Sequence, residues 1–192
     1  MNTIKVIVIG NSGVGKTRTI KKICNSSYDG NKTIGVDFES KVFIYNNLSY
    51  KILFWDCAGD SRFNNIIRSY YNNTKYIAIF FDADSSSFEE DINYWRSELN
   101  HNLEINKFEI IYIGIYDYEV NDIIEKYLIN NKYNYILINR NNFENYEITN
   151  PLIDLFDKDH VFDSKCNINT KLLSENESKY RNCCGTGTCS IL

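Results

Sequence analysis

The eight residues GNSGVGKT, at positions 10–17, constrain the fold of this chain more than any other stretch. They match the pattern G-x-x-x-x-G-K-[ST] in full, and that pattern binds phosphate when it lies between a strand and a helix. The apolar run at 3–10 predicts a buried strand before it, and GKTRTIKKIC predicts a helix after it. The sequence therefore predicts a phosphate-binding loop at the end of a first strand.

Such a loop holds an anion by two means. Its backbone N–H groups curl around phosphate oxygens, and the helix that follows adds the positive end of its dipole. Lys16 is expected to neutralise the β- and γ-phosphates, and the Thr17 hydroxyl to ligate Mg²⁺. The residues predicted to contact the phosphates are Ser12, Gly13, Val14, Gly15, Lys16 and Thr17.

Further apolar runs alternate between strand-like and helix-like spacing, which favours an α/β fold. Strands are predicted at 38–45, 50–55, 76–82, 108–114 and 133–139, the first two joined as a hairpin through NNLS. Helices are predicted at 87–99 and 120–129, and a last helix is predicted with Asn150 as its cap and Pro151 as its first residue. We therefore expect a mostly parallel six-stranded sheet with helices on both faces and ligands at the carboxyl ends of the strands.

Length and composition indicate one compact domain. The chain has 192 residues, a formal net charge of −4 and 43% hydrophobic residues. The periodicity fades near residue 157, so we expect a domain over 1–156 and a flexible tail over 157–192. The acidic balance argues against nucleic acid as a partner. No apolar run approaches the roughly 20 residues of a membrane span, and no signal peptide is apparent at the N-terminus, so the cytosol is the expected location.

Two further motifs, TIGVDF at 33–38 and WDCAGDSRF at 55–63, complete a recognisable set. With the phosphate loop, they make residues 3 to about 114 resemble the Ras superfamily of small GTPases, most closely its Rab branch. The resemblance implies a P-loop GTPase fold that binds GTP or GDP with Mg²⁺. It implies that Thr33 completes the Mg²⁺ shell, that Asp56 holds Mg²⁺ through water, and that Gly59 offers its N–H to the γ-phosphate.

The chain departs from this family where the base is read. The family has Asn-Lys-x-Asp after the fifth strand, whereas here Gly114 is followed by IYDY, so Ile115 and Tyr118 replace the Asn and the Asp. Asp117 can read the base only if the loop is one residue shorter, and no Ser-Ala-Lys loop is found near INRNNFENYE. Tyr28 sits where the family has an aromatic residue that stacks on the base, so the resemblance implies the same role for it, since stacking needs no base-specific edge. An ordinary surface tyrosine is the alternative. We therefore expect a reduced preference for guanine.

Asp60 is a second departure, because it occupies the position of the family's catalytic Gln. Gln orients the attacking water with one donor and one acceptor, but an ionised Asp has only acceptors. About 5 Å from a γ-phosphate oxygen it would be repelled by roughly 3 kcal/mol at an effective dielectric of about 20. We expect a degenerate catalytic position with slow GTP hydrolysis and a side chain that points away from the phosphate. An exposed Asp without a role is the alternative.

The last four residues, CSIL, fit the pattern for geranylgeranylation of Cys189. One lipid chain anchors weakly, and acylation of Cys183 or Cys184 would supply a second signal. We expect the protein to lie on the cytoplasmic face of an endomembrane or of the plasma membrane. In this family the segments around TIGVDF and WDCAGDSRF are called switch I and switch II. The partners implied by the resemblance are effectors at switch I and switch II, an exchange factor, a GTPase-activating protein and a prenyl-binding chaperone.

Three functions remain open at this point. The first is a Rab-like GTP-binding switch in vesicular trafficking with slow intrinsic hydrolysis, favoured by the intact phosphate and Mg²⁺ residues. The second is a degenerate GTPase that binds nucleotide weakly or without selectivity and acts as a membrane-tethered adaptor, favoured by the lost base-reading motif. The third is a P-loop NTPase that is not a GTPase.

Overall fold

The structure is a computed structural model that describes residues 2–72, 74–102 and 108–157. The predicted tail beyond Asp157, with Cys183, Cys184 and Cys189, lies outside the described residues. Within the part that is described, no helix combines the length and the apolar content that a membrane span requires.

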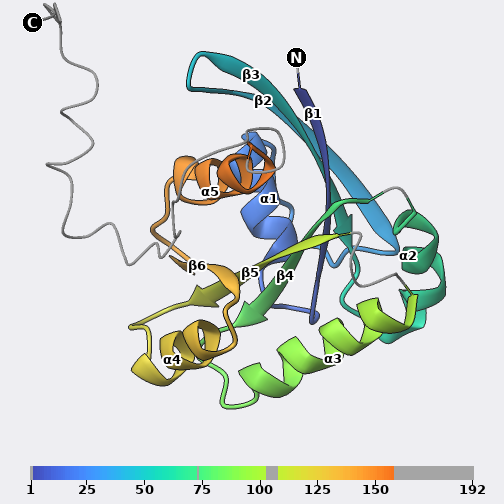
Figure 1. The fold of residues 1–192 in the computed structure, drawn as a ribbon. Coiled ribbons are helices and arrows are strands. Elements are labelled where there is room, and N and C mark those ends of the chain that lie inside the picture. The colour runs from blue at the N-terminus through green and yellow to red at the C-terminus, as the bar shows by residue number, and fades with distance from the viewer. Residues whose placement is uncertain (1, 73, 103–107, 158–192) are drawn as a thin grey trace, which may run out of the picture.

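Six strands form one sheet in the order β2-β3-β1-β4-β5-β6 (Figure 1). They are β1 Asn2–Gly10, β2 Val36–Tyr45, β3 Leu48–Cys57, β4 Tyr76–Asp82, β5 Glu109–Tyr116 and β6 Asn134–Asn139. The β2–β3 pair is antiparallel and every other pair of neighbours is parallel. The predicted mostly parallel six-stranded sheet is confirmed.

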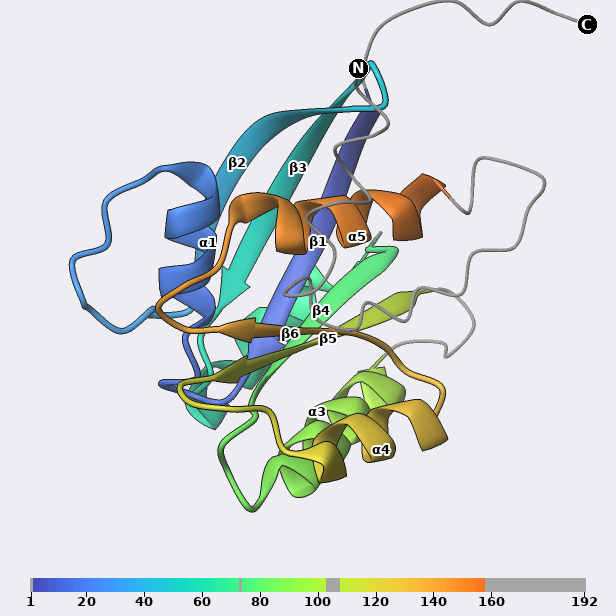
Figure 2. The same ribbon diagram turned by 90° about the vertical axis from the view of Figure 1, so that its left-hand side faces the viewer.

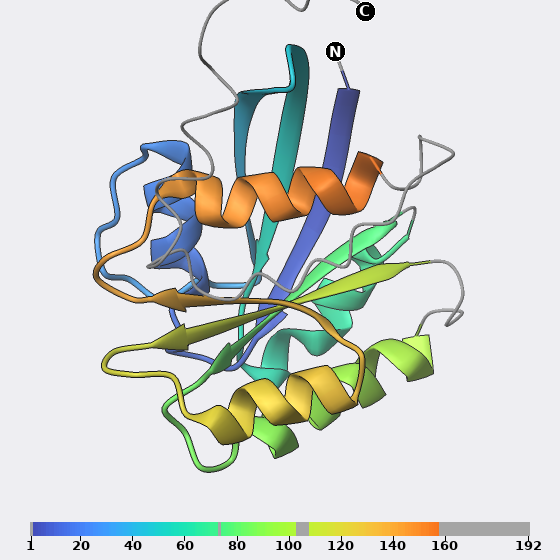
Figure 3. The ribbon, with the colours of Figure 1, turned by 60° about the vertical axis from the view of Figure 1, so that its left-hand side comes forward.

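Helices cover both faces of this sheet. In the described residues they are α1 Lys16–Cys24, α2 Asn64–Tyr70, α3 Phe88–Asn102, α4 Asp122–Asn130 and α5 Asn145–Asp157. Figures 2 and 3 show α1 and α5 on one face, with α3 and α4 on the other. Because side chains alternate along a strand, β1 sends Val6 and Val8 into the core under α1 and α5, and Ile7 and Ile9 into the opposite core.

The hairpin between β2 and β3 is tighter than predicted. Its turn consists of Asn46 and Asn47 alone, with φ of 47° and 62°. Two consecutive left-handed residues make the turn that best matches the twist of the flanking strands, and Asn tolerates that conformation. Leu48, which was expected in the loop, is therefore already in β3 and pairs with Tyr45.

The predicted start of the last helix is wrong. Helix α5 begins at Asn145, and Pro151 lies inside it rather than at its first position. The Glu147 carboxylate accepts a hydrogen bond from the backbone N–H of Glu144, which caps the helix about two turns before Pro151. Burial of Ile148 in the core under α5 then holds the earlier turn in place.

Candidate functional site

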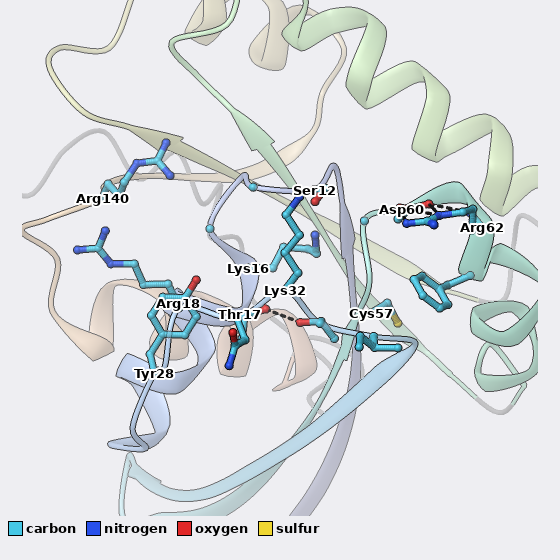
Figure 4. A pocket seen from close by; sticks show the side chains of 18 residues that line it. Ser12, Lys16, Thr17, Arg18, Tyr28, Lys32, Cys57, Asp60, Arg62 and Arg140 are labelled. Carbon is cyan, nitrogen blue, oxygen red and sulfur yellow. Dashed lines mark hydrogen bonds and ion pairs between the residues drawn. The ribbon is translucent and has the colours of Figure 1, made fainter.

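A cavity of about 590 Å³ opens at the carboxyl ends of the parallel strands. Figure 4 shows its lining, which comes from the phosphate loop, α1, the segment before β2, the segment after β3 and the residue after β6. The predicted site residues that line it are Ser12, Gly13, Gly15, Lys16, Thr17, Tyr28, Thr33, Gly59 and Asp60. Val14, Asp56 and Asp117 are not in the lining, although Asp56 and Asp117 bond to residues that are.

The backbone of the phosphate loop requires glycine at its two ends. Gly15 precedes α1 with φ of 108°, in the left-handed region. At Gly10 a Cβ atom would lie 2.2 Å from the carbonyl oxygen of Phe80, so a side chain there would push β1 and β4 apart. The first turn of α1 carries no acidic side chain, so the positive end of its dipole faces the cavity without a counter-charge on the helix.

The side chain of Lys16 folds back onto the start of the phosphate loop. Its ammonium donates to the carbonyl oxygens of Gly10 at 2.8 Å and Asn11 at 2.9 Å. The side chain is buried, and burial lowers the pKa of Lys16 to about 8, while the charge of Asp56 opposes that shift. The ammonium is thereby fixed at the floor of the cavity, where it can pair with an anion.

The loop is also supported from α3, which the sequence did not indicate. The indole N–H of Trp95 donates to the side-chain oxygen of Asn11 at 2.8 Å. Trp95 is fully buried, so this bond lies in a water-poor environment and holds the loop against the helix.

Three oxygen-bearing side chains converge beside Lys16. The Thr17 hydroxyl donates to Oδ2 of Asp56 at 2.5 Å and lies 2.8 Å from the Thr33 hydroxyl. Thr33 also donates to Oδ2 of Asp56, at 3.1 Å. Thr33 reaches this point from the segment before β2 and Thr17 from α1, so the two hydroxyls meet at a carboxylate of β3.

This arrangement fits a magnesium ion. Asp56 is 2% exposed, and among the described residues its Oδ1 atom has no hydrogen-bond partner. Burial raises the pKa of Asp56, because a carboxylate out of water loses its hydration. Mg²⁺ takes oxygen ligands from hydroxyl and carboxylate groups and from phosphates, and it would satisfy the unpartnered oxygen.

Gly59 brings the segment after β3 against the phosphate loop. A Cβ atom at Gly59 would lie 2.3 Å from the backbone nitrogen of Ser12 and 2.5 Å from the carbonyl oxygen of Gly10. Only glycine allows this approach, and it places the main chain of residue 59 at the wall of the cavity.

Asp60 forms an ion pair with Arg62. Its carboxylate accepts from the Arg62 backbone N–H at 3.0 Å and from the guanidinium at 2.7 to 3.1 Å (Figure 4). These hydrogen bonds from Arg62 hold the pKa of Asp60 at about 2. Asp60 is therefore ionised at neutral pH, caps the 3-10 turn Ser61–Phe63 and carries no proton to donate.

The far end of the cavity, where the base is expected, contains an arginine that the sequence motifs did not indicate. Arg140 lines the cavity together with Tyr28, whose side chain is half exposed. Its Nε donates to Oδ1 of Asp117 at 2.9 Å. The two residues directly follow the paired strands β6 and β5, so the parallel register places them side by side. The sequence did contain one sign of this, because Arg140 is a positively charged residue directly after the last predicted strand, at 133–139.

Comparison with known proteins agrees with this geometry. The family model described as "Ras of Complex, Roc, domain of DAPkinase" matches residues 5–116. Rab-18 of Caenorhabditis elegans is 32% identical over 102 residues, which are 52% of this chain and 50% of that protein. A probable Rab-related GTPase of Acanthamoeba polyphaga mimivirus is 30% identical over 170 residues, 82% of this chain and 76% of that protein. Human Rab-34 is 36% identical over 96 residues, which are 49% of this chain and 37% of that protein.

The chain thus spans about half the length of Rab-18 and three quarters of the viral relative. The family match covers more than half of the chain, including the phosphate loop, both switch motifs and the strand that ends beside Asp117. On this match and on the confirmed fold, the chain belongs to the Ras superfamily of small GTPases, as a divergent Rab-like member.

Proposed function

We propose that this protein is a membrane-tethered, Rab-like GTP-binding switch in vesicular trafficking, with slow intrinsic GTP hydrolysis. The main support for this proposal is that the hydroxyls of Thr17 and Thr33 both lie against the buried carboxylate of Asp56, beside the ammonium of Lys16. Thr33 belongs to the segment that changes with nucleotide in this family, so its hydroxyl at the metal position supports a switch.

The phosphates would lie along the loop, held by the amides of Ser12 to Thr17 and by Lys16. Mg²⁺ bound at Thr17 and Thr33, with Asp56 behind it, would neutralise charge on the β- and γ-phosphates. The main-chain N–H of Gly59 would donate to the γ-phosphate. GTP but not GDP would then tie the segment after β3 to the loop.

Hydrolysis is expected to be slow because of Asp60. Its ionised carboxylate is paired with Arg62 and has no donor with which to orient water and phosphate together. Arg62 is in turn occupied by Asp60, so it does not supply positive charge to the γ-phosphate in this arrangement. The lifetime of the GTP state would depend on a partner that supplies an arginine and on an exchange factor.

Exposed apolar side chains near the cavity would form the surface that partner proteins recognise. Ile34, Phe38 and Ile66 are 81%, 47% and 51% exposed. Ile34 lines the cavity, and Phe38 and Ile66 lie in β2 and α2, next along the chain to the segments that would contact the γ-phosphate. Effectors are proposed to bind here. Geranylgeranylation of Cys189, with acylation of Cys183 or Cys184, would hold the protein on the cytoplasmic face of a membrane and would require a prenyl-binding chaperone.

Calorimetry with GTP and GDP, each with and without Mg²⁺, tests this proposal. We expect both nucleotides to bind the full chain and Mg²⁺ to strengthen binding. Thr17→Val removes the hydroxyl at nearly constant volume, so it should abolish the Mg²⁺ enhancement. Thr19→Val makes the same change on α1 outside the cavity lining and should retain it.

A degenerate GTPase that serves as a tethered adaptor is the second candidate. Ile115 and Tyr118 in place of the family's Asn and Asp favour it, because a base without its reader binds weakly. Absence of binding by either nucleotide at high micromolar protein would support the adaptor and refute the switch.

A further inference from the structure

We propose that Arg140 selects bases with an oxygen at C6 by donating hydrogen bonds to the O6 and N7 atoms of the base, while Asp117 orients its guanidinium. The inference rests on the proposed function, because it names the base that the nucleotide site accepts. It predicts recognition of guanine, hypoxanthine and xanthine together, and rejection of adenine.

The fold places Arg140 at the base end of the cavity. Strands β5 and β6 are parallel, and Tyr116 is opposite Asn139 at their ends. The backbone N–H of Arg140 continues this ladder by donating to the carbonyl oxygen of Tyr116 at 2.8 Å. Arg140 thus leaves the sheet at a defined point, and its side chain is one wall of the cavity that also contains Lys16.

Asp117 holds the guanidinium of Arg140 through its Nε atom. Nε donates to Oδ1 of Asp117 at 2.9 Å, and Nη1 makes only a long contact of 3.4 Å with the carbonyl oxygen of Val14. Among the described residues, Nη2 has no hydrogen-bond partner, and the Arg140 side chain is 20% exposed. The terminal nitrogens therefore keep donor capacity within a largely enclosed setting.

Asp117 is itself fixed, as a positioning residue must be. Its backbone N–H donates to Oδ2 of Asp84 at 2.7 Å, and its carbonyl oxygen accepts from the amide of Asn139 at 3.2 Å. Its carboxylate faces Arg140, and this pairing engages one of the two oxygens that a direct two-point contact with the N1–H and 2-amino groups of guanine would need.

The chemistry of the base edges then sets the selectivity. Guanine presents two acceptors, O6 and N7, and a guanidinium donates to both at once. Hypoxanthine and xanthine have the same two acceptors. Adenine has a hydrogen-bond donor, the 6-amino group, in place of the O6 acceptor. One N–H group of Arg140 would then face the 6-amino group of adenine, and two donors cannot form a hydrogen bond. The 2-amino group is not read in this scheme, so guanine and hypoxanthine should bind about equally.

The test is displacement of ribose-labelled fluorescent GDP from the full-length protein in Mg²⁺ by GDP, IDP, 7-deaza-GDP and ADP. We expect GDP and IDP to bind about equally and ADP to bind roughly 5- to 150-fold more weakly. The 7-deaza compound lacks the N7 acceptor and should fall between GDP and ADP.

Variants separate reading of the base from general support. Arg140→Ala should lower GDP and IDP affinity by the same factor and bring the ratio of ADP to GDP affinity close to one. Arg68→Ala removes an arginine that is also ion-paired, to Glu98, but lies outside the cavity, and should leave the ratio as in the wild type. Asp117→Asn should weaken the preference for GDP over ADP without favouring XDP.

Several outcomes would overturn the inference. Equal affinity for ADP and GDP in the wild type would show that the base is held by stacking alone, and the proposed nucleotide site would survive. A shift from GDP to XDP in Asp117→Asn would assign base reading to Asp117. Failure of every nucleotide to bind would overturn the proposed function and this inference with it.

Discussion

Replacing Gly59 with alanine puts a methyl group into the contact between the segment after β3 and the phosphate loop. The new Cβ would lie 2.3 Å from the Ser12 nitrogen, whereas side-chain carbons in proteins essentially never approach closer than 3.0 Å. The two segments must therefore separate by at least about 0.7 Å, and overpacking of this kind costs about 1–3 kcal/mol of folding stability.

The same displacement should act on the two nucleotides unequally. Moving the Gly59 amide away from the γ-phosphate removes a hydrogen bond to a charged group, which contributes about 1.5–3 kcal/mol. GTP affinity should therefore fall roughly 10- to 150-fold. GDP has no γ-phosphate, so its affinity should change only slightly.

Calorimetry with GDP and with a slowly hydrolysed GTP analogue measures both affinities, and urea denaturation measures the loss of stability. Ser61→Ala is the matched control, because Ser61 is exposed two residues away. Equal losses for the two ligands would mean that alanine distorts the whole loop, and the role of Gly59 at the γ-phosphate would be refuted.

Three further predictions concern hydrolysis, membrane attachment and the support of the loop. Asp60→Gln should raise single-turnover GTP hydrolysis, each tenfold gain being about 1.4 kcal/mol of barrier, while Asp60→Ala should stay near the wild type; loss of hydrolysis in the alanine variant would make Asp60 a working base. Cys189→Ser should leave the protein in the soluble fraction of cells, and undiminished membrane fractionation would contradict prenylation there. Trp95→Phe leaves the Asn11 side-chain oxygen without its donor and should cost about 1–3 kcal/mol in urea denaturation, with an unchanged midpoint as the contrary result.

The sheet could be predicted because its central strands are buried on both faces and appear as continuous apolar runs. YIAIFFD became β4 with the predicted bounds, Tyr76–Asp82. The start of α5 was missed because Asn150 and Pro151 carry a strong helix-start signal, which the cap at Glu144 and the burial of Ile148 overrode. Helix α2 was not predicted, since it has only seven residues, of which Ile67 alone is buried.

The phosphate and metal residues could be identified from motifs, because their order along the chain is enough to recognise them. The pairing of Arg140 with Asp117 could not, because it depends on the register of β5 against β6, which a single sequence does not specify. The Arg62 contact with Asp60 is local, but whether an exposed arginine pairs with a neighbour or extends into solvent depends on the backbone of the turn.

The two-residue turn at Asn46 and Asn47 also has a consequence for the order of folding. Hairpins with so short a connection close within about 1–10 μs, and among the described strands β2 and β3 are the paired neighbours that no helix separates along the chain. Strand β1, by contrast, must wait for both of its neighbours, since Val8 pairs with Asp56 and with Ala78. During synthesis β1 is made before β3 and β4, so its apolar side chains stay without their partner strands until both have been made.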